Sequence, residues 1–149
     1  MSTTESRRRE WMGALALAEG DRLRAAWEAL AAAPEYSVMR GPETGLVMVR
    51  ARAGNSGRRF NLGEMTVTRC SVLLAAGYMG HAWIAGVRPE HARLAAVFDA
   101  LLQQPERFPG LHETLIGPLL FERRERLARR TQEVLPSKVD FFTLVRGEG

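Results

Sequence analysis

The stretch GLVMVRARAGNSGRRFNLGEMTVTRCSVLLA, residues 45–75, predicts a long β-hairpin and sets the fold class. In its first half, Val47 and Val49 alternate with Leu46 and Met48, the two-residue period of a strand with one buried face. The central GNSG consists of residues that tolerate turn conformations, so the chain is expected to reverse there. In the second half the apolar phase changes at residues 63–64, which predicts a β-bulge.

Helices and one more strand are expected around this hairpin. Apolar residues at helical spacing predict two helices upstream, over residues 11–18 and 22–33, that pair as a helical hairpin. Downstream, residues 78–86 predict a further strand, and residues 89–103, opened by a proline, predict the clearest helix. A helix over residues 119–134 has too few apolar residues to be stabilised by packing on the core of the domain, so we expect it to project.

The C-terminal segment, SKVDFFTLVRGE at residues 137–148, is predicted to be an extended apolar arm that binds a groove. Burying each of its large apolar side chains is worth roughly 1.5–3 kcal/mol. We therefore divide the chain into a single α+β domain, residues 1–136, and an arm, residues 137–149. The fold class is α+β, with an N-terminal helical hairpin, an antiparallel sheet, C-terminal helices and the extended arm.

Composition limits the possible partners without choosing among them. The 149-residue chain has a net charge of +4, carried almost entirely by arginine, since Lys138 is the one lysine. Arginine suits carboxylate and phosphate groups, so nucleic acid, a phosphorylated small molecule and acidic neighbouring subunits are all compatible with the charge. The single cysteine, Cys70, excludes an internal disulfide framework and favours the cytoplasm. Residues 70–87 contain three glycines and favour buried strands over a membrane span.

Arginines flank the predicted hairpin tip and form a candidate anion site. Paired strands would bring their guanidinium groups together over the turn. The alternative is a solvated hairpin end whose charges discourage edge-to-edge pairing. The four residues are Arg50, Arg52, Arg58 and Arg59.

The other reactive residue types do not form a motif. The three histidines and Cys70 lack metal-ligand spacing, so no metal site is expected. His91 is best explained by packing or capping, with a ligand or proton-transfer role as the alternative. Residues 123–130 hold an arginine cluster without interleaved aromatic residues, which favours a solvated face or an acidic partner over nucleic acid. No phosphate-binding glycine loop is present, and no catalytic residue can be assigned.

Six blocks in order resemble the PhnG subunit family of the bacterial carbon-phosphorus lyase system. They are ETGLV at 43–47, TVTR at 66–69, GHAWIAG at 80–86, HARLAAVFDALLQQ at 91–104, LHETLIGPL at 111–119 and SKVDFFTLVRGE at 137–148. The resemblance implies an obligate subunit of an assembly that uses phosphonates. With PhnH-like, PhnI-like and PhnL-like subunits, such a chain takes part in making α-D-ribose 1-methylphosphonate 5-triphosphate from MgATP and methylphosphonate, with release of adenine. A PhnJ-like subunit then cleaves the carbon-phosphorus bond.

The resemblance implies that the tail is a partner-binding segment and that the chain itself binds no cofactor. The two phenylalanines of the tail would be buried, while Asp140 and Arg146 would pair at the rim. The candidate partner-binding residues are Val139, Asp140, Phe141, Phe142, Leu144 and Arg146. A homodimer with exchanged arms is a further expectation. The alternatives are a stand-alone basic protein that binds nucleic acid or a phosphate ligand, and a chain that is itself an enzyme.

Overall fold

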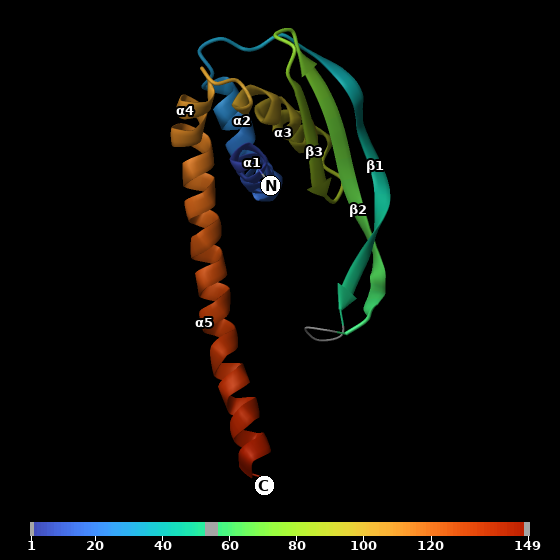
Figure 1. Cartoon of the computed structure of the whole chain (residues 1–149), viewed down its shortest axis with the longest axis vertical. Helices are drawn as coiled ribbons and strands as arrows, with labels where there is room; N and C mark the ends of the chain where they lie inside the picture. Colours follow the sequence, from blue (N-terminus) through green and yellow to red (C-terminus); the bar gives the residue numbers. More distant parts are fainter. Residues whose placement is uncertain (1, 53–56, 148–149) are drawn as a thin grey trace.

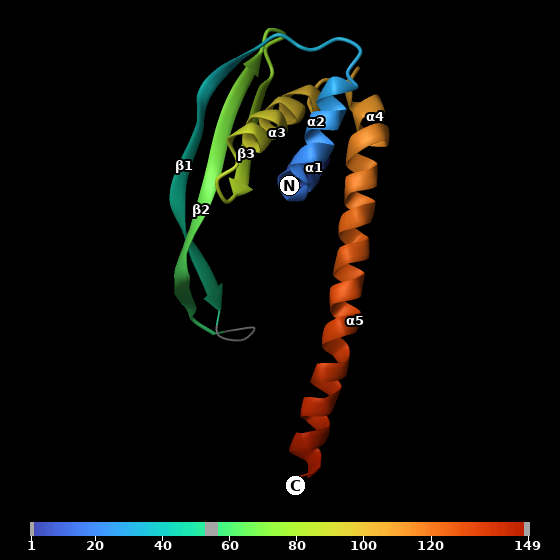
Figure 2. The same ribbon diagram turned by 180° about the vertical axis from the view of Figure 1, so that it is seen from behind.

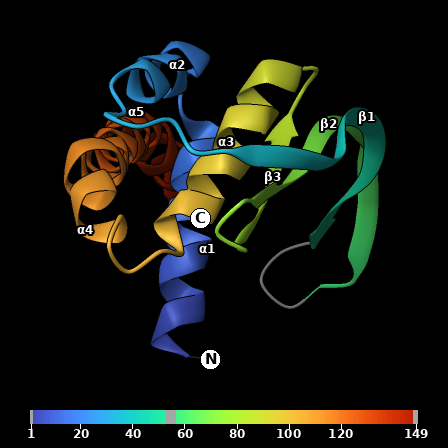
Figure 3. The ribbon, with the colours of Figure 1, turned by 90° about the horizontal axis from the view of Figure 1, so that it is seen from above.

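The computed structural model describes residues 2–52 and 57–147, with side chains described for residues 2–51 and 57–133. It has an α+β fold in which a three-stranded antiparallel sheet covers one side of a central helix, and the other helices cover the opposite side (Figures 1 and 3). The elements are α1 (Thr3–Leu17), α2 (Gly20–Glu28), β1 (Tyr36–Arg52), β2 (Arg59–Leu74), β3 (Met79–Ala85), α3 (Pro89–Leu102), α4 (Phe108–Leu111), the π-helical turn η1 (His112–Ile116) and α5 (Gly117–Gly147).

The predicted hairpin is confirmed as strands β1 and β2. Val49 lies opposite Gly63 and Arg50 lies opposite Asn61, so Leu62 is the extra residue of a bulge beside the predicted position. Strand β1 begins at Tyr36, before the segment from which the hairpin was predicted. It continues through Pro42 because this proline lies at a register shift on an edge strand, where its missing N–H removes no ladder bond.

Helix α3 is the centre of the core. It is buried almost throughout and packs on β2 and β3, whose inward side chains include Val72, Ala82 and Ile84. Gly80 sets the distance between sheet and helix, since a Cβ there would lie 1.9 Å from the carbonyl oxygen of Ala96. Only glycine therefore allows this close approach of β3 to α3.

The two predicted N-terminal helices are present. In a helical hairpin they would pack along each other, but here each packs mainly on α3. Helix α1 begins earlier than predicted, at a capping box in which Ser2 and Glu5 exchange hydrogen bonds. Helix α2 ends at Glu28, several residues before the predicted end, with Ala29 as its C-cap.

A buried carboxylate joins three of these elements. Asp99 of α3 is fully buried and accepts hydrogen bonds from both Nε and Nη2 of Arg8, at 3.1 and 2.8 Å. It also accepts from Nε1 of Trp11 at 2.8 Å and from the backbone N–H of His81 at 2.9 Å. The hydrogen bond to Asp99 raises the pKa of Arg8 above its ordinary value. The network fixes α1 and the edge strand β3 to α3.

The C-terminal helix projects from the body, as the sequence predicted. Helix α5 packs against η1 and α1 at its start, and an ion pair between Arg22 and Glu122 joins it to α2. Beyond this it extends away in the same direction as the tip of the β1–β2 hairpin (Figures 1 and 2). Its backbone is helical to Gly147, which differs from the extended arm expected after Pro136. A helix satisfies its own backbone hydrogen bonds, whereas an extended segment needs a paired strand.

Candidate functional site

The best-defined polar cluster lies on the sheet face opposite α3. Register places Glu43 of β1 beside Arg69 of β2, and Arg69 beside Trp83 of β3. Their neighbours in sequence point inward, so alternation puts these three side chains together on the outer face. The guanidinium carbon of Arg69 lies 5.6 Å from the ring centroid of Trp83, within cation–π range.

Two arginines share one carboxylate oxygen in this cluster. Nε of Arg40 and Nε of Arg69 each donate a 2.6 Å hydrogen bond to Oε1 of Glu43. Both contacts lower the pKa of Glu43 below its ordinary value, and the hydrogen bond from Arg40 has the larger effect. Within the part of the chain that the structure describes, neither arginine has a second ion-pair partner, so two cations and one anion leave a net charge of +1.

A hydroxyl–imidazole pair occupies the next row of the same face. Oγ of Ser71 and Nδ1 of His81 are 2.8 Å apart, and both side chains are half-buried. Beside them Trp83 is 53% exposed. With its arginines held by Glu43, the face offers guanidinium N–H groups and a flat aromatic ring, the side chains that most often anchor a bound partner. Among the described residues, no three His, Cys, Asp or Glu side chains are placed to hold a metal ion.

A second feature is apolar surface on the parts that project from the body. The distal half of the hairpin carries large apolar side chains that are 42–65% exposed: Leu46, Met48, Phe60, Leu62 and Met65. Helix α5 adds Phe121 and Leu127, which are 63% and 52% exposed. The predicted buried face of the hairpin is thus only half-buried at Val47 and Val49. These surfaces suit contact with another protein.

The predicted anion site at the hairpin tip has no contacts in the structure that support it. Arg50, Arg58 and Arg59 are exposed, and no hydrogen bond or ion pair joins their side chains to other described residues. The side chain of Arg52 lies outside the described residues. The site stays a prediction.

The predicted partner-binding residues of the tail lie in helix α5, where the structure describes their backbone but not their side chains. They are Val139, Asp140, Phe141, Phe142, Leu144 and Arg146. Their role therefore stays a prediction as well.

His91 has the packing role that the sequence favoured. It is 5% exposed, and its Nε2 donates a 2.8 Å hydrogen bond to the backbone oxygen of Leu15.

The sequence did not predict that the residues of the polar cluster on the outer face of the sheet lie together. Glu43, Arg69 and Trp83 each lie inside a block that resembles the PhnG family, yet strand register was needed to place them side by side.

In the described part of the chain, no helix is long and apolar enough to cross a bilayer.

Comparison with known proteins decides the family. The model of the family described as phosphonate metabolism protein PhnG matches residues 6–147. The chain belongs to the PhnG family. A relative from Rhizobium meliloti (strain 1021), the PhnG subunit of α-D-ribose 1-methylphosphonate 5-triphosphate synthase, is 46% identical over 146 residues. The match spans 96% of this chain and 91% of the relative. Five of the six blocks of the PhnG resemblance lie wholly within residues 6–147, and the sixth lies within them up to residue 147.

Proposed function

We propose that this chain is a subunit of an α-D-ribose 1-methylphosphonate 5-triphosphate synthase within a carbon-phosphorus lyase complex. The observation that carries the proposal is the 46% identity to a PhnG subunit of that synthase, sustained over nearly the full length of both chains. Relatives this similar over their whole length share a fold, and the named activity of the relative is a property of an assembly.

The shape of the molecule supports an assembly subunit. A two-stranded ribbon that extends past its core is marginally stable in water, and the distal hairpin here exposes five large apolar side chains. Helix α5 likewise extends from the body, and its Phe121 and Leu127 are 63% and 52% exposed. Both elements gain stability when a neighbouring subunit covers them.

The proposed partners are PhnH-like, PhnI-like, PhnJ-like and PhnL-like subunits in the cytoplasm. MgATP and methylphosphonate are substrates of the whole complex, and this chain binds no cofactor of its own. It acts mainly as a structural or co-catalytic component. The outer face does hold a hydroxyl beside an imidazole, Ser71 and His81, but among the described residues no group bonds to the second ring nitrogen of His81 to orient it as a base. An exchange of C-terminal segments between two copies is part of the same proposal.

Co-expression with the sister subunits tests this proposal. The full-length chain and a chain cut after Leu135 are each purified with PhnI-like and PhnJ-like subunits and measured by light scattering. We expect the full-length chain to enter a complex and the shortened chain to enter it poorly. A full-length chain that stays alone, with adenine release by the sister subunits unaffected by its absence, contradicts the proposal.

A further inference from the structure

The hydrogen-bond pattern of the sheet leaves part of one edge unpaired. Leu74 donates to the carbonyl of Tyr78, and Gly86 donates to the carbonyl of Thr66. In an antiparallel ladder alternate residues point their backbone groups to the same side. Even-numbered residues of β3 therefore face β2, while the N–H and C=O groups of Trp83 and Ala85 point to the free edge.

Side chains of α3 close the other half of this edge. The N–H of His81 donates to Asp99, and the carbonyl of Met79 accepts a 2.7 Å hydrogen bond from Nε2 of Gln103. For Trp83 and Ala85, no hydrogen bond at the free edge is found among the described residues. The edge is thus closed at one end and open at the other.

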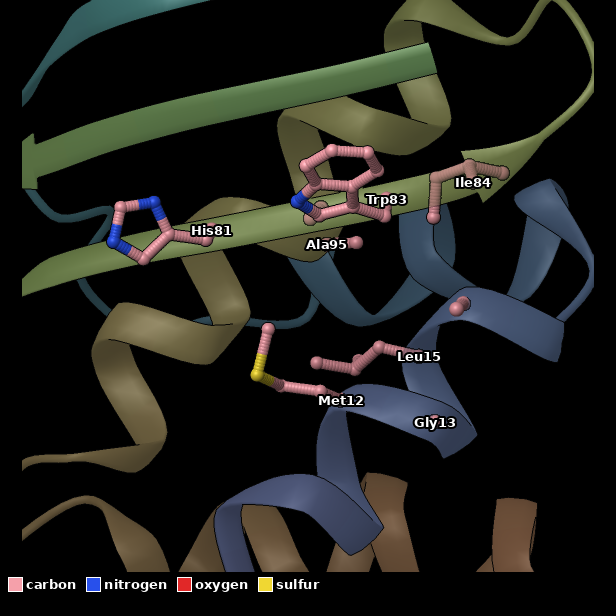
Figure 4. A pocket seen from close by; sticks show the side chains of 9 residues that line it. Met12, Gly13, Leu15, His81, Trp83, Ile84 and Ala95 are labelled. Carbon is pink, nitrogen blue, oxygen red and sulfur yellow. The ribbon is translucent and has the colours of Figure 1, made fainter. Parts of the chain in front are cut away.

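A groove lies beside the open half. Helix α1 forms its second wall with Met12 and Gly13, and Ile84 lines it from the strand (Figure 4). Ala16 of α1 lines it as well. The cavity measures about 230 Å³, and apolar side chains dominate its lining. Because Ala16 is small, α1 leaves space beside the strand, whereas a Cβ added at Gly13 would lie 3.2 Å from Nη1 of Arg123 on α5.

We propose that this edge receives an extended segment of a sister subunit, which adds a fourth strand beside Trp83 and Ala85 and places an apolar side chain in the groove. Free N–H and C=O groups two residues apart match an extended chain, and an apolar pocket beside the edge selects the added side chain. Strand β1 also has an open edge, but register shifts interrupt its pairing near both ends. The inference rests on the proposed function, which supplies the sister subunit.

Hydrogen exchange at single amides tests the strand addition directly. The full-length chain is labelled alone and in the co-purified complex, then dissociated and read by NMR. The amides of Trp83 and Ala85 are expected to exchange fast in the free chain and roughly tenfold or more slowly in the complex. The amides of Ala82 and Ile84, which bond to β2, should be protected in both states.

A backbone variant separates strand addition from ordinary surface contact. Ala85→Pro removes only an N–H that points to the free edge, and proline is accepted at such positions. It should lose binding to the sister subunits, whereas the control Ala85→Ser keeps it. If the proline variant fails to fold, Ala16→Leu fills the groove from α1 and gives the same test.

The outcomes distinguish the two proposals. The strand addition is overturned if the amides of Trp83 and Ala85 still exchange fast in the complex. It is also overturned if the complex forms with both Ala85→Pro and Ala16→Leu. Either result leaves the proposed function intact. Absence of any complex with the unmodified chain overturns both.

Discussion

The backbone N–H of His81 donates a 2.9 Å hydrogen bond to Oδ2 of Asp99 and thereby ties the edge strand β3 to the central helix α3. The same carboxylate accepts hydrogen bonds from Arg8 and Trp11, so residues far apart in the sequence meet at one buried anion. It is fully satisfied by an arginine and two further N–H donors, as a buried charge requires.

Removing this carboxylate is expected to destabilise the protein strongly. Asp99→Ala leaves the buried N–H groups of Trp11 and His81 without an acceptor and the charge of Arg8 without its partner. We expect the free energy of unfolding to fall by about 3–5 kcal/mol, the range for breaking a buried ion pair. Urea denaturation measures it. Arg8→Met leaves the fully buried carboxylate of Asp99 without its cation and should be costly as well. A loss under about 1 kcal/mol for Asp99→Ala would falsify the structural role.

Two strand glycines give a matched pair of tests for the packing of sheet on helix. In Gly80→Ala the new Cβ would lie 1.9 Å from the Ala96 carbonyl oxygen, so β3 must move away from α3. A loss of about 3 kcal/mol or more in unfolding free energy is expected. The control is Gly45→Ala on β1, where nothing lies within 4 Å of the added Cβ. Equal effects from both substitutions would contradict this account of Gly80.

The apolar tip of the hairpin is expected to matter for assembly and little for the stability of the free chain. Met48→Ser and Leu62→Ser change side chains that are 52% and 63% exposed, so the unfolding free energy should change by no more than about 0.5 kcal/mol. Recovery of the sister subunits in co-purification should fall. Val87→Ser, at a residue 69% exposed but away from the hairpin, serves as the control. Undiminished recovery with both hairpin variants would exclude this surface as an interface.

The carboxyl group of Glu43 should titrate below the ordinary range of glutamate. Arg40 and Arg69 favour its charged form, and Arg40 has the larger effect. Because the folded-state pKa is lowered, any stability that this group adds is present above its unfolded pKa and is lost as pH falls through the folded pKa. Carboxyl ¹³C NMR measures the titration. Arg40→Met should raise the pKa more than Arg69→Met does, and the reverse order would refute this assignment of causes.

Local patterns in the sequence were enough for most of the fold. Alternation and a change of phase predicted the β1–β2 hairpin and its bulge, because side chains of a strand alternate between faces whatever lies beyond them. Pro89 and the apolar stripe behind it predicted α3, because a helix forms from neighbours in the chain. The same local reasoning placed β3 and the projecting polar helix, and the six blocks pointed to the PhnG family.

Contacts between distant segments needed the tertiary structure. Nothing in the spacing of Arg8, Trp11 and Asp99 indicates that they share one carboxylate, since their meeting depends on how α1 lies across α3. Strand register likewise decided that Glu43 and Arg69 lie side by side, and it also decided which backbone groups of β3 stay open. The sequence by itself determined most of the elements and the family, because periodicity and motifs are local. Only the tertiary structure decided the polar sites, because they form where elements far apart in the chain pack together.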